Sequence, residues 1–310
     1  MSAYRNGGSF LLLSFLWGTA FVAIKVGLEF IPPVTFAAFR YDVAGLIMLA
    51  YAASVTDYWL PRSWADWMAV ILGSTLIIAL YNAFLFIGQQ GVNSGVAAIL
   101  VAMNPILATG FSRLFLPNER LKPLGIAGLV LGFVGVGLVV SPSPSNLLAD
   151  DLTAPGFIFL AAVCVALGSV LVQRIDSGIS TEGMVAWSCV FGAVVLHAVG
   201  VLLPAESLEA AEFTIKSILV ILYLSVLASA IGYFIYFDLL ERLGAIEINL
   251  VSYTAPVFAA LFGWIVLNET LDPLTVVGFG VIVAGFVLLK REALINEFGS
   301  IRRVIVSRRR

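Results

Sequence analysis

Long runs of apolar residues separated by short polar breaks dominate the pattern along this chain. A membrane-spanning helix requires about 20 mostly apolar residues, and ten stretches meet this condition. They cover residues 9–28, 34–55, 66–88, 94–116, 124–141, 155–173, 184–203, 216–239, 245–267 and 273–291. Turn-forming and charged residues collect at the breaks between them. The pattern predicts an all-α polytopic membrane protein with ten transmembrane helices.

One of these breaks occurs twice. Segment 118–124, NERLKPL, recurs as segment 268–274, NETLDPL, and each copy joins two apolar stretches. Pro105 upstream of the first copy matches Pro256 upstream of the second, with one inserted residue before Asn118. The chain therefore divides into a first half, residues 1–150, and a second half, residues 151–291, with five predicted spans each. Residues 292–310 form a basic tail, predicted to be cytoplasmic.

The odd number of spans per half fixes the relation between the halves. Because the second half enters the bilayer from the opposite side, the two halves are predicted to be inverted repeats. Glu119 and Glu269 then lie at opposite faces of the membrane. Inverted repeats are typical of secondary transporters that alternate around a central site.

The basic residues predict the orientation. Lysines and arginines favour the cytoplasmic side of short loops. With both termini in the cytoplasm, 14 of the 17 basic residues lie on that side, and only Lys25, Arg40 and Lys216 do not. We therefore expect both termini to be cytoplasmic.

Composition narrows the class further. Hydrophobic residues make up 61% of the 310 residues and charged residues only 12%, which favours a bilayer over a soluble fold. Cys164 and Cys189 both fall in apolar runs and are interpreted as small core residues. The sequence contains no metal-spaced His/Cys cluster, Walker-type phosphate loop or nucleophile elbow. We expect no metal, no cofactor, no nucleic-acid partner and no enzyme activity.

Several segments together resemble a known family. They are Leu16-Trp17-Gly18-Thr19-Ala20-Phe21, Arg40-Tyr41, the run from Pro105 to Gly135, and the run from Gly232-Tyr233 to Gly285. Their order and duplication resemble the drug/metabolite transporter superfamily, specifically its ten-helix EamA-like branch. The resemblance covers about residues 8–291. It implies a secondary carrier of small organic solutes, often an exporter of amino acids or other metabolites.

Charged groups inside the predicted spans are candidates for solute binding, since each costs about 2.5–3.5 kcal/mol at a helix centre. Trp17, Phe21 and Lys25 recur at intervals of four on one helix face. Lys25 and Arg40 are expected at a similar depth, where two cations can bind an acidic group. The alternatives are that Arg40 pairs with Asp42 or Glu29, and that Lys25 reaches the outer interface.

Tyrosines and amides form a second candidate group, because each combines an apolar body with a hydrogen-bonding tip. The set comprises Tyr81, Asn82, Asn104, Tyr233, Tyr236 and Tyr253. Lining a solute cavity and joining neighbouring helices are equally good interpretations for each of them.

Two further groups complete the predictions. Gly128, Gly132 and Gly135 in the fifth stretch, with Gly278 and Gly285 in the tenth, indicate close helix packing, within the chain or across a homodimer. His197 and Glu247 are candidates for proton coupling, the alternatives being a packed neutral histidine and a surface carboxylate.

These observations favour a solute carrier of the plasma or inner membrane, working by alternating access around a midplane cavity. Its expected partners are a small-molecule substrate and the lipid bilayer, with a homodimer as a further prediction. Two alternatives stay open. One is a lipid flippase of the same fold, and the other is a membrane-embedded lipid-modifying enzyme.

Overall fold

The computed structural model describes residues 2–115, 123–140, 152–244, 248–289 and 291, and this part of the chain is helical without any strand. In the first half the elements are α1 (Ser2–Gly27), α2 (Pro33–Val55), α3 (Trp64–Leu72), η1 (Gly73–Leu80), α4 (Tyr81–Gln89), α5 (Ser94–Val101), α6 (Asn104–Phe115) and α7 (Pro123–Val140). In the second half they are α8 (Thr153–Arg174), α9 (Thr181–Leu202), η3 (Pro204–Glu206), η4 (Leu208–Ala210), α10 (Ile215–Leu222), η5 (Tyr223–Ile231), α11 (Gly232–Leu243), α13 (Val251–Leu267) and α14 (Pro273–Leu289).

Seven helical stretches of the described chain are long and apolar enough to cross a membrane. They are Arg5–Gly27, Pro33–Val55, Trp64–Gln89, Ser94–Phe115, Thr153–Arg174, Thr181–Leu202 and Ile215–Leu243. Three shorter apolar helices, Leu124–Val140, Val251–Leu267 and Pro273–Leu289, lie at the remaining predicted stretches. The all-α polytopic membrane fold is confirmed.

The α13–α14 turn shows how the repeated motif ends one helix and starts the next. Asn268 adopts the left-handed conformation at φ 55°, and its N–H bonds back to Gly263 and Trp264 of α13. Asparagine tolerates this conformation better than most residues and commonly ends helices. Pro273 then opens α14, a position where a missing N–H costs nothing.

The third and eighth spans share an unusual internal design. Each begins with a capping box, Ser63 with Asp66 and Thr214 with Ser217, so the matched residues are 151 apart. Each then changes from α-helix to π-helix, in η1 and in η5, before returning to α-helix. π-Helical turns are rare and occur frequently at functional sites.

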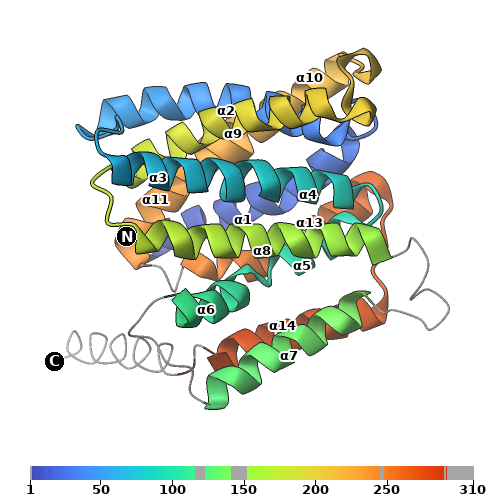
Figure 1. Cartoon of the computed structure of the whole chain (residues 1–310). Coiled ribbons are helices and arrows are strands. Elements are labelled where there is room, and N and C mark those ends of the chain that lie inside the picture. The colour runs from blue at the N-terminus through green and yellow to red at the C-terminus, as the bar shows by residue number, and fades with distance from the viewer. Residues whose placement is uncertain (1, 116–122, 141–151, 245–247, 290, 292–310) are drawn as a thin grey trace.

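Helices α7 and α14 lie side by side at one edge of the bundle (Figure 1). A Cβ on Gly135 would lie 2.8 Å from the Gly278 carbonyl oxygen, and one on Gly285 would lie 2.7 Å from the Gly128 carbonyl oxygen. Glycines of the two halves therefore face each other in pairs. Gly132 contributes to both sides of α7, because its backbone borders Gly285 and its own Cβ position borders Ile106 of α6.

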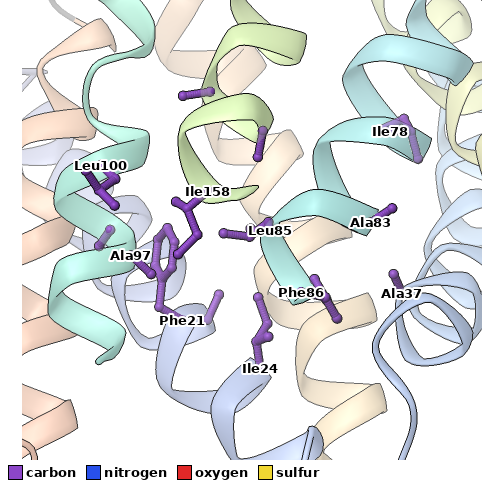
Figure 2. Close-up of a cluster of buried hydrophobic side chains, with 14 of the residues drawn as sticks. Phe21, Ile24, Ala37, Ile78, Ala83, Leu85, Phe86, Ala97, Leu100 and Ile158 are labelled. Atoms are coloured by element: carbon purple, nitrogen blue, oxygen red, sulfur yellow. The ribbon is translucent and has the colours of Figure 1, made fainter. Parts of the chain in front are cut away.

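Apolar side chains fill the centre of the bundle (Figure 2). Phe21 of α1, Leu85 of α4 and Ile158 of α8 come together in one cluster of buried residues. In a bilayer such packing stabilises the fold through close contact between helices, because lipid offers no hydrophobic driving force between them.

Tryptophans gather where α2 ends and where α3 and α9 begin. The rings of Trp59 and Trp187 stack with centroids 6.4 Å apart, and Trp67 lies 6.3 Å from Trp187. Trp187 Nε1 also donates to the Trp59 carbonyl oxygen at 3.0 Å. Tryptophan is enriched at membrane–water interfaces, so this cluster indicates one boundary of the bilayer.

Candidate functional site

Arg40 of α2 is a buried cation in the membrane-spanning part of the bundle. Only 9% of its surface is exposed. Its Nε donates to Ser229 Oγ of η5 at 3.1 Å, and its guanidinium carbon lies 5.1 Å from the centre of the Tyr41 ring. The first half thus supplies the cation, and the second half supplies its hydroxyl partner.

The carboxylates considered as ion-pair partners of Arg40 have other partners. Asp42 Oδ2 lies 2.8 Å from His197 Nε2 of α9, and Glu29 Oε2 lies 3.4 Å from Lys216 Nζ. The alternative prediction, in which Arg40 pairs with Asp42 or Glu29, is therefore wrong. Asp42 is two residues from Arg40 and hence on a different helix face, the face that meets α9.

Tyrosines of both halves lie within reach of the charge of Arg40, and Trp17 and Tyr236 join this group through ring contacts that include Tyr233. The charge of Arg40 interacts with Tyr41, Tyr81, Tyr223 and Tyr233. Trp17 of α1 stacks on Tyr236 with centroids 5.7 Å apart and meets Tyr233 edge-on at 6.5 Å. We call Trp17, Arg40, Tyr41, Tyr81, Tyr223, Tyr233 and Tyr236 the Arg40 cluster.

The π-helix η5 holds the cluster together through three further hydrogen bonds. Ser225 Oγ donates to the Arg40 carbonyl oxygen at 2.9 Å, one turn before Ser229. Trp17 Nε1 donates to the Ala228 carbonyl oxygen at 3.1 Å, and the hydroxyls of Thr19 and Tyr223 lie 2.5 Å apart. One π-helical segment is thereby bonded to both α1 and α2.

Sequence reasoning missed Ser225, Ser229 and Tyr223. The signal that could have found them is their spacing, since Ser225 and Ser229 are one turn apart in an otherwise apolar stretch. The third candidate of the first helix, Phe21, is 8% exposed and belongs to the apolar core, away from the ring contacts of the Arg40 cluster.

Asn82 of α4 positions the Tyr41 ring of the Arg40 cluster. Its side chain is fully buried, donates to the Ile78 carbonyl oxygen at 2.7 Å and accepts from the Tyr41 hydroxyl at 3.4 Å. Its contacts join α4 to α2 and fix the position of the Tyr41 ring.

Asn104 and Tyr253 each present a buried polar atom, Asn104 Oδ1 and the Tyr253 hydroxyl, that has no hydrogen-bond partner among the described residues. The Tyr253 ring packs on Phe286 of α14 at 4.7 Å. Buried polar atoms of native proteins nearly always have a partner, so these two atoms are further candidates for contact with water or solute.

The ammonium group of Lys25 is bound to backbone carbonyl oxygens. Its Nζ donates to the carbonyl oxygens of Gln89, Gln90 and Val92 at 2.9, 2.9 and 3.0 Å. These carbonyls end α4, where a cation complements the helix dipole. Lys25 therefore ties α1 to the α4–α5 turn.

Replacing Lys25 with methionine should lower the stability of the protein. Hydrogen bonds from charged donors contribute about 1.5–3 kcal/mol each, so we expect a loss of at least about 1.5 kcal/mol. Thermal unfolding in detergent would measure it. Lys216→Met is the matched control, because its pair with Glu29 is 58% and 55% exposed and such pairs contribute about 0–1 kcal/mol. Equal midpoints for the two variants would contradict this role of Lys25.

The two proton-coupling candidates are His197 and Glu247. His197 pairs with Asp42, their side chains are 42% and 41% exposed, and Phe39 meets the imidazole edge-on at 5.7 Å. The pair joins α2 of the first half to α9 of the second. Glu247 lies outside the described residues.

Cys164 and Cys189 are free thiols, and Cys189 is fully buried beside Arg40.

The fold is that of a multi-pass membrane protein, with a buried arginine on one of its apolar helices. The sequence profile of the EamA-like transporter family matches residues 8–141 and again residues 153–291. The chain therefore belongs to the EamA-like transporter family, within the drug/metabolite transporter superfamily. It is a multi-pass membrane transporter.

Individual relatives agree with this assignment. The inner membrane transporter YedA of Escherichia coli strain K12 is 30% identical over 288 residues, covering 91% of this chain and 89% of YedA. A WAT1-related chloroplastic protein of Arabidopsis thaliana is 28% identical over 280 residues, covering 89% of this chain and 67% of that protein. One crystal structure shares the fold with a TM-score of 0.66 at 21% identity, covering 94% of this chain and 98% of that one.

Proposed function

We propose that this transporter is a secondary carrier of small organic solutes, such as amino acids or related metabolites, in the plasma or inner membrane. It has ten spans in two inverted halves, 1–150 and 151–291, and both termini are cytoplasmic. It works by alternating access and serves as an exporter or exchanger. The observation that carries the proposal is the Arg40 cluster, which both halves build together in the bundle interior.

The contact between Glu269 and Ser94 supports the inverted arrangement. Glu269 Oε2 accepts the Ser94 N–H at 2.9 Å, so the second motif copy lies at the end of the bundle where α5 begins. The span Ser94–Phe115 then crosses the bundle. Phe115, three residues before the first copy in sequence, is consequently at the opposite end. Two equivalent motifs at opposite ends are what inverted repeats produce.

The same contacts close the outer end in this state. Asn93 Nδ2 donates to the Thr270 carbonyl oxygen at 3.0 Å, next to the Glu269 contact and to the turn held by Lys25. Residues of the first half are thus bonded to the α13–α14 turn of the second half. Opening towards the outside requires these bonds to break.

In the Arg40 cluster the Trp17 ring contacts the rings of Tyr236 and Tyr233, and Arg40 itself is buried. A cavity of about 280 Å³ lies instead among the outer loops, lined by residues that include Phe30, Pro33, Gln90 and Glu212. In the proposed cycle the two halves rock apart, the rings of the Arg40 cluster separate, and a solute enters between them. This sequence of steps matches the alternating-access model.

Counterflow in proteoliposomes tests the proposal. Vesicles would be preloaded in turn with pools of amino acids, organic acids, amines and nucleosides, and the uptake of labelled members would be followed. We expect saturable uptake that depends on the preloaded pool and is absent from protein-free vesicles. Failure across all pools by a protein with a sharp thermal transition would contradict the solute carrier, and a fluorescent-lipid assay would then test the flippase alternative.

A further inference from the structure

We propose that the solute is a monocarboxylate with an uncharged, flat apolar body and no ammonium group, and that Arg40 binds its carboxylate. This inference rests on the proposed function and names its substrate class. It narrows the class within organic solutes, because zwitterionic amino acids become poor substrates.

Arg40 has unused hydrogen-bonding capacity. A guanidinium carries five N–H donors, and among the described residues only Nε has an acceptor, Ser229 Oγ. Within the same described part of the chain, neither Nη group has an acceptor. They form the end of the planar fork that pairs with two oxygens of a carboxylate. Ser229 and the Tyr41 ring hold the guanidinium from its other sides.

The charge of Arg40 has no carboxylate partner among the described residues. The buried carboxylates of the described chain serve backbone amides elsewhere: Asp66 accepts from Gly178 and Ile179, and Glu206 accepts from Val34 and Thr35. Glu269 likewise accepts from Ser94. An unpaired charge in a low-dielectric interior is costly. A ligand carboxylate would supply the missing counter-charge.

The surroundings of Arg40 offer no partner for a second charge on the ligand among the described residues. The titratable neighbours on which the charge of Arg40 acts are tyrosines and Cys189, all neutral at physiological pH. An ammonium group would find no described carboxylate beside Arg40, and a second carboxylate would find no second cation there. One negative charge therefore matches this site, and a zwitterion or a dicarboxylate does not.

The aromatic rings of the Arg40 cluster suit a flat apolar ligand body. Trp17 and Tyr236 stack, and Tyr233 stands edge-on to Trp17. Such rings bind flat apolar groups by stacking and edge contacts. Aryl acids and aromatic 2-oxo acids combine a flat body with a single carboxylate.

Binding of four probes with one aromatic skeleton tests the inference. Radiolabelled phenylpyruvate would be bound to purified protein in a scintillation-proximity assay, with unlabelled phenylalanine, phenethylamine and phenylsuccinate as competitors. We expect phenylpyruvate to bind at least about tenfold more tightly than each competitor, a difference that one lost charge-assisted hydrogen bond produces. Phenylalanine binding as tightly as phenylpyruvate, or no phenylpyruvate binding at all, would overturn the inference.

Variants locate the carboxylate. Arg40→Gln should weaken phenylpyruvate binding at least about tenfold. Arg40→Lys, which keeps the charge but loses the fork, should have an intermediate effect. Ser229→Ala should weaken binding less, because it only frees the guanidinium to move. Arg242→Gln is the matched control, since Arg242 pairs with Asp238 near the end of α11. Unchanged binding by Arg40→Gln would contradict the assignment.

Thermal unfolding separates ligand binding from a structural role. Because Arg40 has no carboxylate partner in the described chain, Arg40→Gln without ligand should unfold at or above the wild-type temperature. Phenylpyruvate should raise the midpoint of the wild type but not of the variant. A lower midpoint for unliganded Arg40→Gln would show that Arg40 is structural.

Transport distinguishes this inference from the proposed function. Counterflow of amines or amino acids with no counterflow of phenylpyruvate would keep the carrier and overturn the monocarboxylate. Binding of phenylpyruvate at Arg40 without any counterflow would keep the binding site and contradict the carrier.

Discussion

Gly135→Val should separate α7 from α14 and destabilise the protein by at least about 1–3 kcal/mol, the usual cost of overpacking. A Cβ at Gly135 would lie 2.8 Å from the Gly278 carbonyl oxygen and 2.9 Å from the Ile282 N. These neighbours are backbone atoms of the opposing helix, so no side-chain rotation relieves the overlap. The two helices must move apart along their contact.

Gly137→Val is the control for Gly135→Val. Gly137 lies two residues further along the same helix, and a Cβ there would meet nothing within 4 Å. Both variants change helix propensity in the same way, so the difference between them reports packing alone. Thermal unfolding in detergent would measure that difference. If Gly135→Val and Gly137→Val unfolded at the same temperature, the α7–α14 contact would not be a source of stability.

Close packing at these glycines could be foreseen because the repeat puts small residues at equivalent positions of both helices, although the observed pairs are Gly128 with Gly285 and Gly135 with Gly278. Gly128 and Gly135 match Gly278 and Gly285 at one offset, and a small residue at each position lets two backbones approach. The sequence left open whether the partner helix belonged to the same chain. The structure brings α7 and α14 of one chain together, and the homodimer stays a prediction.

The membrane spans could be predicted because hydropathy is a local property. The bilayer imposes a length and an apolar composition on each span independently of its neighbours. The change to π-helix in η1 and η5 was not predictable, because a π-helical turn depends on local hydrogen bonds. Ser74 and Thr75 in η1, for example, donate to carbonyl oxygens one turn earlier, at Val70 and Ile71.

The members of the candidate site were easier to predict than their partners. Arg40 and the tyrosines stand out because polar groups in apolar stretches are expensive. Their contacts depend on which helices become neighbours. Asp42 meets His197 across 155 residues of sequence, and Lys25 meets the α4–α5 turn about 65 residues away. Helical spacing along one element contains no information on such pairs.

Buried acids at helix ends were missed altogether, and Asp66 is the clearest of them. Asp66 is fully buried at the start of α3. Its Oδ2 accepts from the Tyr58 hydroxyl and from the N–H groups of Arg62 and Ser63, at 2.8–3.0 Å. Its Oδ1 accepts from the N–H groups of Gly178 and Ile179 in the second half, at 3.0 and 3.1 Å. One carboxylate joins the α2–α3 and α8–α9 turns.

Glu206 makes the matching connection at the other end of α2 and α9. Its carboxylate accepts from Val34 and Thr35 at the start of α2, at 2.9 and 3.1 Å. In each case an acid of one half binds two backbone amides of the other half. The two connections bind α2 of the first half to α9 of the second half near both ends of the pair.

Asp66→Ala should consequently reduce stability by at least about 3 kcal/mol, since five donors lose a charged acceptor and hydrogen bonds to charged groups contribute about 1.5–3 kcal/mol each. Asp66→Asn keeps the shape and one good acceptor, so its loss should be smaller. The pKa of Tyr58 is raised by its hydrogen bond to Asp66 and should return towards its ordinary value in Asp66→Ala.

Asp57→Ala is the matched control, because Asp57 lies in the same turn with an exposed side chain. Its unfolding temperature should stay close to that of the wild type, as is usual for surface substitutions. The midpoints of the three variants should therefore follow the order Asp57→Ala, Asp66→Asn, Asp66→Ala, from highest to lowest. An Asp66→Ala protein as stable as Asp57→Ala would show that the two turns are held by other contacts.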